Sequence, residues 1–271
     1  MLGKLMKHEC KATSRLMAPL LLVVLGLGLV VRVYDGILKN ADSSWIIERL
    51  HGLLIFAFVI ALIAAVVCAV VLMVQRFSKN LMGDEGYLMF TLPVSDHALI
   101  FSKLLVSVIW FLAVIAVDLL AVLIAVYEKG MMHDIADFFA ATWRALQNYY
   151  LAARGWVVVE LVLLLLVSLA LSCLQFYAPI AIGHSFAKRK GLLSVVFFFV
   201  LQFIQQTIAT GLLAKLVEKI FLWNVTEPYT AVQVGGHTQW VILWTLGCEV
   251  ILAGILYLIT WLMMKKRLNL A

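Results

Sequence analysis

The chain has 271 residues, of which 65% are hydrophobic and 13% are charged. Soluble globular proteins are about half apolar and about a quarter charged, so this composition excludes a soluble enzyme, a disordered chain and a nucleic-acid-binding domain, although the net charge is +6. A bilayer span needs roughly 20 apolar residues, and the apolar excess is sufficient for several spans. We therefore expect an all-α, polytopic membrane protein with a single transmembrane domain over residues 1–271.

Before the first apolar stretch, the chain carries a cationic stripe. Lys4, Lys7 and Lys11 recur at a spacing of three to four residues and continue in Arg15. This spacing predicts an amphipathic interfacial helix over residues 1–15 on the inner leaflet of the lipid bilayer. Each cation close to anionic lipid contributes about 1 kcal/mol to such binding.

Six apolar stretches are long enough to be spanning helices. They cover residues 16–34, 52–74, 98–126, 156–182, 192–214 and 240–264. Thirteen of the 21 Lys and Arg residues lie before the first stretch, around the second and fourth connections, or in the tail. The positive-inside rule makes this face cytosolic, so we expect a multi-pass protein of the plasma membrane with both termini in the cytosol.

The connection between the second and third stretches is the most informative segment. Acidic residues at its start can cap a short helix, Pro93 stops that helix, and Ser95 or Asp96 caps the next one. The pattern predicts a short cytosolic helix over residues 84–95 with an exposed apolar face, which is typical of a docking site. Its candidate docking residues are Asp84, Glu85, Tyr87, Leu88, Phe90, Leu92 and Pro93. The alternative is a helix lying flat on the inner leaflet, although its acidic end suits anionic lipid poorly.

The external connections, residues 127–155 and 215–239, are rich in aromatic residues. Apolar residues in the first connection recur at helical spacing, which predicts a short amphipathic helix near the outer interface. It would act either as an aromatic anchor or as a lid that contacts substrate.

Three acids lie inside the apolar stretches: Asp118, Glu160 and Glu249. An ionised group near the lipid-facing centre of a bilayer costs at least ~2.5 kcal/mol, so each acid is expected to face the bundle or a wet cavity. The acids either form an outer vestibule for a cationic substrate or are protonated or bonded to neighbours. Those neighbours include Ser107, Ser168, Ser172 and Thr245. In the fifth stretch, a polar band contains Gln202, Gln205, Gln206, Thr207 and Thr210. Gln202, Gln206 and Thr210 share one helix face, which suits an interhelical seam or a pathway lining.

The motifs of an enzyme are missing from the sequence. It contains no G-x-x-x-x-G-K-[ST] phosphate loop, no H-E-x-x-H and no G-x-S-x-G. His133 and Asp137 could place two metal ligands on one helix face, but a solvated face is the better interpretation. The four cysteines are too widely spaced to suggest a disulfide framework or a metal cluster. We expect neither catalysis nor a bound metal or cofactor in this chain.

Two segments resemble those of the ABC-2-type permeases, the membrane subunits of ATP-driven exporters of bacterial type. The first is Glu85-Gly86-Tyr87-Leu88-Met89-Phe90-Thr91-Leu92-Pro93-Val94-Ser95 with Lys103, which is similar to the family's E-x-x-x-x-x-x-L-P-V-S…K segment. The second is Leu5-Met6-Lys7-His8-Glu9-Cys10-Lys11, which is similar to the K-x-E-x-K helix that leads into the family's first span.

This resemblance implies that residues 84–95 form a coupling helix seated in a separate ABC ATP-binding subunit, which holds ATP and Mg²⁺. It also implies that the N-terminal lysines contact that subunit. Closure of two ATP-binding subunits would rock two permease chains, either a homodimer or a heterodimer, between inward-open and outward-open states.

We therefore expect the permease subunit of an ABC exporter. The resemblance implies peptides, drugs, lipids or polysaccharide precursors as substrates, and the aromatic loops and buried acids favour an amphipathic or cationic peptide or drug. The alternative is a non-transporting membrane scaffold or sensor that docks a cytosolic partner through residues 84–95. A secondary transporter would normally show an internal repeat or helices broken by glycine and proline.

Overall fold

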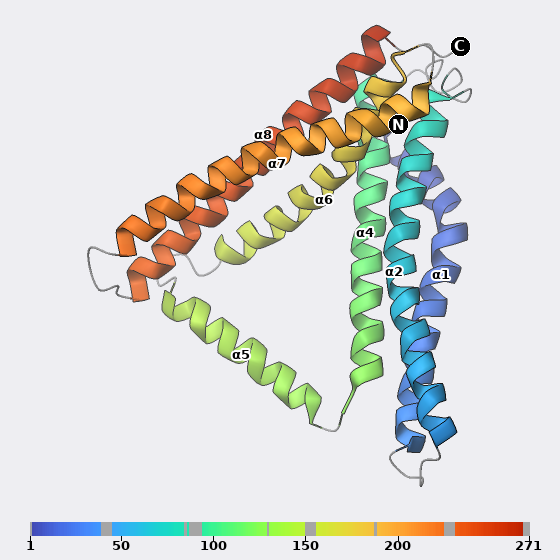
Figure 1. The fold of residues 1–271 in the computed structure, drawn as a ribbon, viewed down its shortest axis with the longest axis vertical. Coiled ribbons are helices and arrows are strands. Elements are labelled where there is room, and N and C mark those ends of the chain that lie inside the picture. The colour runs from blue at the N-terminus through green and yellow to red at the C-terminus, as the bar shows by residue number, and fades with distance from the viewer. Residues whose placement is uncertain are drawn as a thin grey trace. The chain divides into compact units, whose positions relative to one another are not determined.

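A computed structural model of residues 1–271 describes residues 2–38, 45–83, 86, 94–128, 130–149, 156–186, 189–224 and 231–267. Within these residues the regular secondary structure is α-helical (Figure 1). The helices are α1 (Leu2–Leu38), α2 (Trp45–Met82), α4 (Asp96–Val126), α5 (Met131–Tyr149), α6 (Trp156–Gly183), α7 (Lys190–Asn224) and α8 (Ala231–Arg267).

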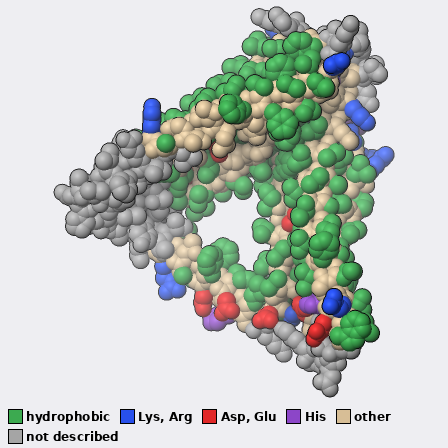
Figure 2. All heavy atoms as spheres, viewed as in Figure 1, with side chains coloured by type: hydrophobic (Ala, Val, Ile, Leu, Met, Phe, Trp, Pro, Cys, Tyr) green, Lys and Arg blue, Asp and Glu red, His purple; other side chains and the backbone are tan. Residues whose placement is uncertain are grey.

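In the described part of the chain, six helices are long and apolar enough to cross a membrane, namely all except α5. Each of the six contains one of the predicted apolar stretches, so these predictions are confirmed as helices. Their outward-facing side chains are large and apolar, as in Leu22 with 68% and Phe203 with 75% of its surface exposed. Figure 2 shows hydrophobic side chains along the lengths of α1, α2 and α4. Because water would not solvate such surfaces favourably, this is the architecture of a multi-pass membrane protein.

The helices extend further than the apolar stretches alone predict. The aromatic connection over residues 127–155 contains α5, which confirms a helix there. Most of the second connection, residues 215–239, is also helical, because α7 extends to Asn224 and α8 begins at Ala231. The reason is local. Residues 212–222 are rich in leucine, lysine and other helix formers, and the first proline after them is Pro228.

The N-terminal residues are continuous with the first span. Residues 2–15, which belong to the predicted interfacial helix, form the first turns of α1 without a break. No glycine or proline lies between Gly3 and Pro19 to interrupt the backbone, and α1 remains helical through Pro19. A single continuous helix therefore contains both the N-terminal residues and the first span.

The chain divides into two compact units. The first unit comprises Met1–Leu81 and Met89–His133, and the second comprises Met82–Leu88 and Asp134–Ala271. In the first unit, α1, α2 and α4 share one apolar core that includes Met17, Ala65 and Val114.

Helices α1 and α4 run in the same direction, because Glu9 meets Lys103 at one end and Gly28 meets Ala121 further along. A Cβ atom added to Gly28 would lie 2.8 Å from the carbonyl oxygen of Ala121. Glycine therefore permits the close approach of two helices that is common in membranes.

In the second unit, α6 packs against both α7 and α8. Helices α6 and α8 also run in the same direction, since Ser168 meets Glu249 and Ser185 meets Met263. Each unit thus pairs its first and third spanning helices in parallel. This is the arrangement that chains with alternating membrane crossings must have.

Candidate functional site

The seven predicted docking residues lie outside the described residues. They are Asp84, Glu85, Tyr87, Leu88, Phe90, Leu92 and Pro93. Both flanks of their segment are described, since α2 ends at Met82 and α4 begins at Asp96. The Oγ of Ser95 accepts a hydrogen bond from the backbone N–H of Ala98 at 3.4 Å, and Ser95 has an extended backbone with φ −68° and ψ 146°. Of the two predicted caps, Ser95 is the one that the structure confirms.

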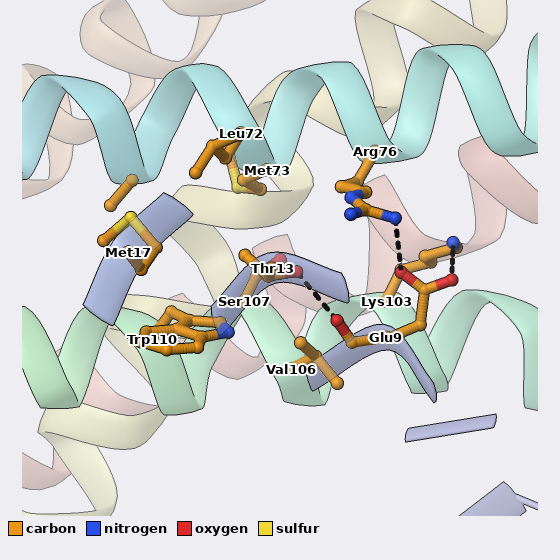
Figure 3. Close-up of a pocket in the computed structure, with 11 residues that line it drawn as sticks. Glu9, Thr13, Met17, Leu72, Met73, Arg76, Lys103, Val106, Ser107 and Trp110 are labelled. Carbon is orange, nitrogen blue, oxygen red and sulfur yellow. Dashed lines mark hydrogen bonds and ion pairs between the residues drawn. The ribbon is translucent and has the colours of Figure 1, made fainter. Parts of the chain in front are cut away.

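An ion-pair cluster joins these two flanks to the N-terminal helix (Figure 3). Glu9 of α1 accepts a hydrogen bond through Oε1 from the ammonium group of Lys103 on α4. Its other carboxylate oxygen, Oε2, lies 3.9 Å from the guanidinium group of Arg76 on α2. We call Glu9, Arg76 and Lys103 the Glu9 cluster.

The Glu9 cluster is buried to different degrees along its length. The side chain of Lys103 is 4% exposed, that of Glu9 is 10% exposed, and that of Arg76 is 30% exposed. Because Lys103 and Glu9 are shielded from water, loss of either partner leaves an uncompensated buried charge, which typically costs about 3–5 kcal/mol. The pair is therefore a strong constraint on the relative placement of α1 and α4.

The position of the cluster connects it to the predicted docking segment. Lys103 lies in the second turn of α4, and Arg76 lies two turns before the end of α2. Through both of them, Glu9 holds the two helices between which residues 84–95 run. The cluster therefore connects both flanks of that segment to α1.

Glu9 and Lys103 both belong to the segments that carry the family resemblance, but their pairing was not predicted from the sequence. One signal could have revealed it. Lys103 is the only cation in the apolar stretch over residues 98–126, and Glu9 is the only acid among residues 1–15. A lysine inside a span requires a counter-charge, and Glu9 is an acid in a segment that is otherwise cationic.

The predicted cationic stripe lies on the side of α1 away from this cluster. Lys4, Lys7 and Lys11 are exposed, whereas Glu9 and Thr13 are buried. The Oγ1 of Thr13 donates a hydrogen bond to the backbone carbonyl of Glu9 at 2.8 Å. The first turns of α1 are thus amphipathic, with one face packed in the first unit and a cationic face turned outward.

The second unit contains a different kind of polar contact, between α6 and α8. The hydroxyl of Ser168 donates to the carboxylate of Glu249, with its Oγ 2.7 Å and 2.9 Å from the two oxygens. Ser168 is one of the neighbours that the sequence allowed for such an acid. The amide of Gln239 donates to Oε1 of Glu160 at 3.4 Å. We call these two contacts the α6–α8 seam.

The predicted pathway acids differ in how fully they are bonded. Both oxygens of Glu249 lie within hydrogen-bond distance of the Ser168 hydroxyl, whereas Glu160 is 9% exposed and its buried Oε2 has no hydrogen-bond partner among the described residues. Asp118 belongs to α4 in the first unit, where it is half-buried and its Oδ1 likewise has no partner in the described part of the chain.

The polar band of α7 makes its interhelical contact through Gln205. The amide of Gln175 on α6 donates to Oε1 of Gln205 at 3.1 Å. Gln202 is half-buried and Gln206 is exposed. The predicted polar band is therefore in contact with α6, but Gln205 is the residue that bonds across the interface.

No protein-family model, curated protein or solved structure matches this chain. In the residues that the structure describes, no three His, Cys, Asp or Glu side chains come close enough to hold a metal ion. The features that bear on function are therefore the two segments with a family resemblance, the Glu9 cluster and the α6–α8 seam.

Proposed function

We propose that this chain is the membrane-spanning permease subunit of an ABC exporter, and that it works as a dimer with separate ATP-binding subunits. The observation that carries the proposal is the Glu9 cluster. It joins α1 to the two helices that flank residues 84–95, the segment that resembles a coupling helix of ABC-2-type permeases. A coupling helix has to pass movement from a cytosolic partner to spanning helices, and this connection supplies a route to three of them.

The mechanism follows from the same connection. ATP and Mg²⁺ bind in the partner subunits, and closure of those subunits displaces residues 84–95. The continuous helices α2 and α4 carry the displacement into the membrane, and the Lys103–Glu9 pair carries it to α1. Both termini face the cytosol in the plasma membrane, and the exposed Lys4, Lys7 and Lys11 contact the inner leaflet or the ATP-binding subunit.

For the substrate we propose an amphipathic or cationic peptide or drug. Support comes from the α6–α8 seam, where the hydrogen-bond partners of Glu160 and Glu249 among the described residues are the neutral Gln239 and Ser168. An acid without a resident cation in a span retains an electrostatic attraction for a positively charged ligand.

The test is affinity capture of the full chain from its native membranes in mild detergent. We expect a protein with a phosphate-binding loop to be captured with it, together with vanadate-sensitive ATPase activity. The substitutions Glu85→Ala and Tyr87→Ala should abolish both, whereas Lys188→Ala, in the other predicted cytosolic connection, should preserve both.

Two outcomes would contradict the proposal. The first is capture in which no ATP-binding protein is found with the wild-type chain. The second is capture, through the same residues, of a partner that lacks a phosphate-binding loop. That second result would instead support the membrane scaffold or sensor that docks a cytosolic partner.

A further inference from the structure

Helix α5 exposes large apolar side chains although it is not one of the six helices that could cross a membrane. Met132 and Phe139 each have 66% of their surface exposed, and Trp143 has 47% exposed. Within the second unit, the described residues give α5 no packed interface with α6, α7 or α8. These side chains therefore need a cover that the described helices of the second unit do not provide.

The apolar side chains of α5 share one face of the helix. The stripe runs through positions 132, 135, 139 and 143, which are three or four residues apart. The opposite face carries Asp137 and Arg144, with Ala140 between them, and all three are exposed. Figure 2 shows acidic side chains gathered along one edge of this helix. The described part of α5 is thus amphipathic, and its polar face carries charges of both signs.

The connections on either side of α5 keep it at the membrane surface. Residues 127–130 join it to the end of α4, and residues 150–155 join it to the start of α6. Because α4 and α6 are consecutive spans, they end and begin at the same face of the bilayer. The 19 residues of α5 make a helix about 28 Å long. Residues 150–155 reach at most ~25 Å when fully extended, so α5 cannot stand upright on the membrane and still be joined to α6.

Aromatic residues mark both points of attachment. Tyr127 directly follows α4, Trp156 begins α6, and their side chains are 40% and 69% exposed. Tyrosine and tryptophan concentrate at the level of the lipid headgroups. Both ends of α5 are therefore joined to residues typical of the depth at which an amphipathic helix inserts its apolar face.

We propose that α5 is an interfacial helix whose apolar face inserts into the outer leaflet of the lipid bilayer. Its partner is the lipid surface, and it anchors the external connection instead of closing over a substrate as a lid. The acids Asp134 and Asp137 outnumber the single cation Arg144 in the described part of its polar face, so anionic lipid is not attracted. Insertion of apolar area is sufficient for binding, and zwitterionic lipid therefore supports it. This inference is independent of the transport activity proposed above.

The test is site-directed spin labelling of the full chain in phosphatidylcholine proteoliposomes, after the four native cysteines have been replaced by alanine. Electron paramagnetic resonance measures the collisions of each label with O₂, which partitions into lipid, and with a nickel chelate, which remains in water. The ratio of O₂ to nickel collisions should be severalfold higher for labelled Met132→Cys and Phe139→Cys than for Ala140→Cys. Ala140 is the matched control, because it is an exposed residue on the charged face of the same helix. Addition of phosphatidylglycerol should leave the ratios unchanged.

Three outcomes would overturn the proposal. Equal access of the nickel chelate to labelled Phe139→Cys and Ala140→Cys would place both faces in water, as expected for an open lid. Protection of Phe139→Cys from both O₂ and the nickel chelate would show that protein covers the apolar face. A high ratio that requires phosphatidylglycerol would make the binding depend on anionic lipid. If Phe139→Cys does not fold, Met132→Cys gives the same comparison.

Discussion

The two units contain buried acids in contrasting surroundings. In the first unit, Glu9 is compensated by Lys103 and approached by Arg76, so an anion and two cations lie together. In the α6–α8 seam, the partners of Glu249 and Glu160 are a serine and a glutamine. Buried carboxylates thus have two different roles in the two units. A compensated acid holds helices together, whereas an acid with neutral partners remains able to attract a cation.

The position of each acid along its helix explains the contrast. Glu9 and Lys103 lie near the N-terminal ends of α1 and α4, and the long side chain of Arg76 reaches the same carboxylate from α2 while it stays 30% exposed. Glu249 lies within its apolar stretch, where a second buried charge would be costly to insert. Serine and glutamine donate hydrogen bonds to these carboxylates without that cost.

The largest effect is expected from breaking the compensated pair. Lys103→Met leaves Glu9 buried with only the more distant Arg76, and should destabilise the protein by ~3 kcal/mol. Adding Glu9→Gln should recover most of this loss, because no uncompensated charge remains. Thermal unfolding of the two single variants and the double variant in detergent measures the coupling. Additive losses in the double variant would contradict a charge pair.

A smaller effect is expected at the close approach of α1 and α4. Gly28→Val places side-chain atoms against the backbone of Ala121 and should destabilise the first unit by about 1–3 kcal/mol. Gly26→Val is the control on the same helix, because a Cβ atom added at Gly26 has no neighbour within 4 Å. Equal unfolding temperatures for the two valine variants would show that the helices do not meet at Gly28.

In the α6–α8 seam, Ser168→Ala removes the donor to Glu249. We expect a loss of about 1 kcal/mol, since interhelical hydrogen bonds in membranes are weak. Ser172→Ala is the matched control, because the Ser172 hydroxyl donates only to a backbone carbonyl of its own helix. The same unfolding assay distinguishes them. If Ser172→Ala lowered the stability as much as Ser168→Ala, the loss would come from a change within α6 and not from the contact with α8.

The smallest effect on stability is expected for Glu160→Gln. Its partner Gln239 is neutral, so the amide should change the free energy of unfolding by no more than ~0.5 kcal/mol. Binding of a lipophilic cation such as tetraphenylphosphonium, measured by equilibrium dialysis, should nevertheless fall about tenfold as the local charge is lost. Unchanged cation binding would remove Glu160 from the proposed pathway.

The features that could be predicted are those determined by residues close together in the sequence. The length and composition of the apolar stretches were sufficient to predict all six long helices. The order of Pro93 and Ser95 was sufficient to predict where α4 begins. Over residues 215–239, helix formers beyond the apolar stretches extend α7 to Asn224 and start α8 at Ala231, which hydropathy alone does not predict.

The candidate sites depend on longer distances. Glu9 and Lys103 are 94 positions apart, and their pairing requires α1 and α4 to run in parallel with a particular rotation of each helix. The same dependence on rotation explains why, within the predicted polar band, Gln205 bonds to α6 instead of the face that carries Gln202 and Gln206. Composition and spacing identify such residues as polar groups in a span but do not identify their partners.

The most direct test of the central claim is photo-crosslinking from position 88, in the segment proposed to dock the ATP-binding subunit. A photoreactive amino acid in place of Leu88 should give an adduct with a protein that carries a phosphate-binding loop when native membranes are irradiated. The yield should change when ATP and vanadate are added. Adducts with lipid alone, or with a protein that does not bind ATP, would contradict the assignment of this chain as an ATP-driven permease.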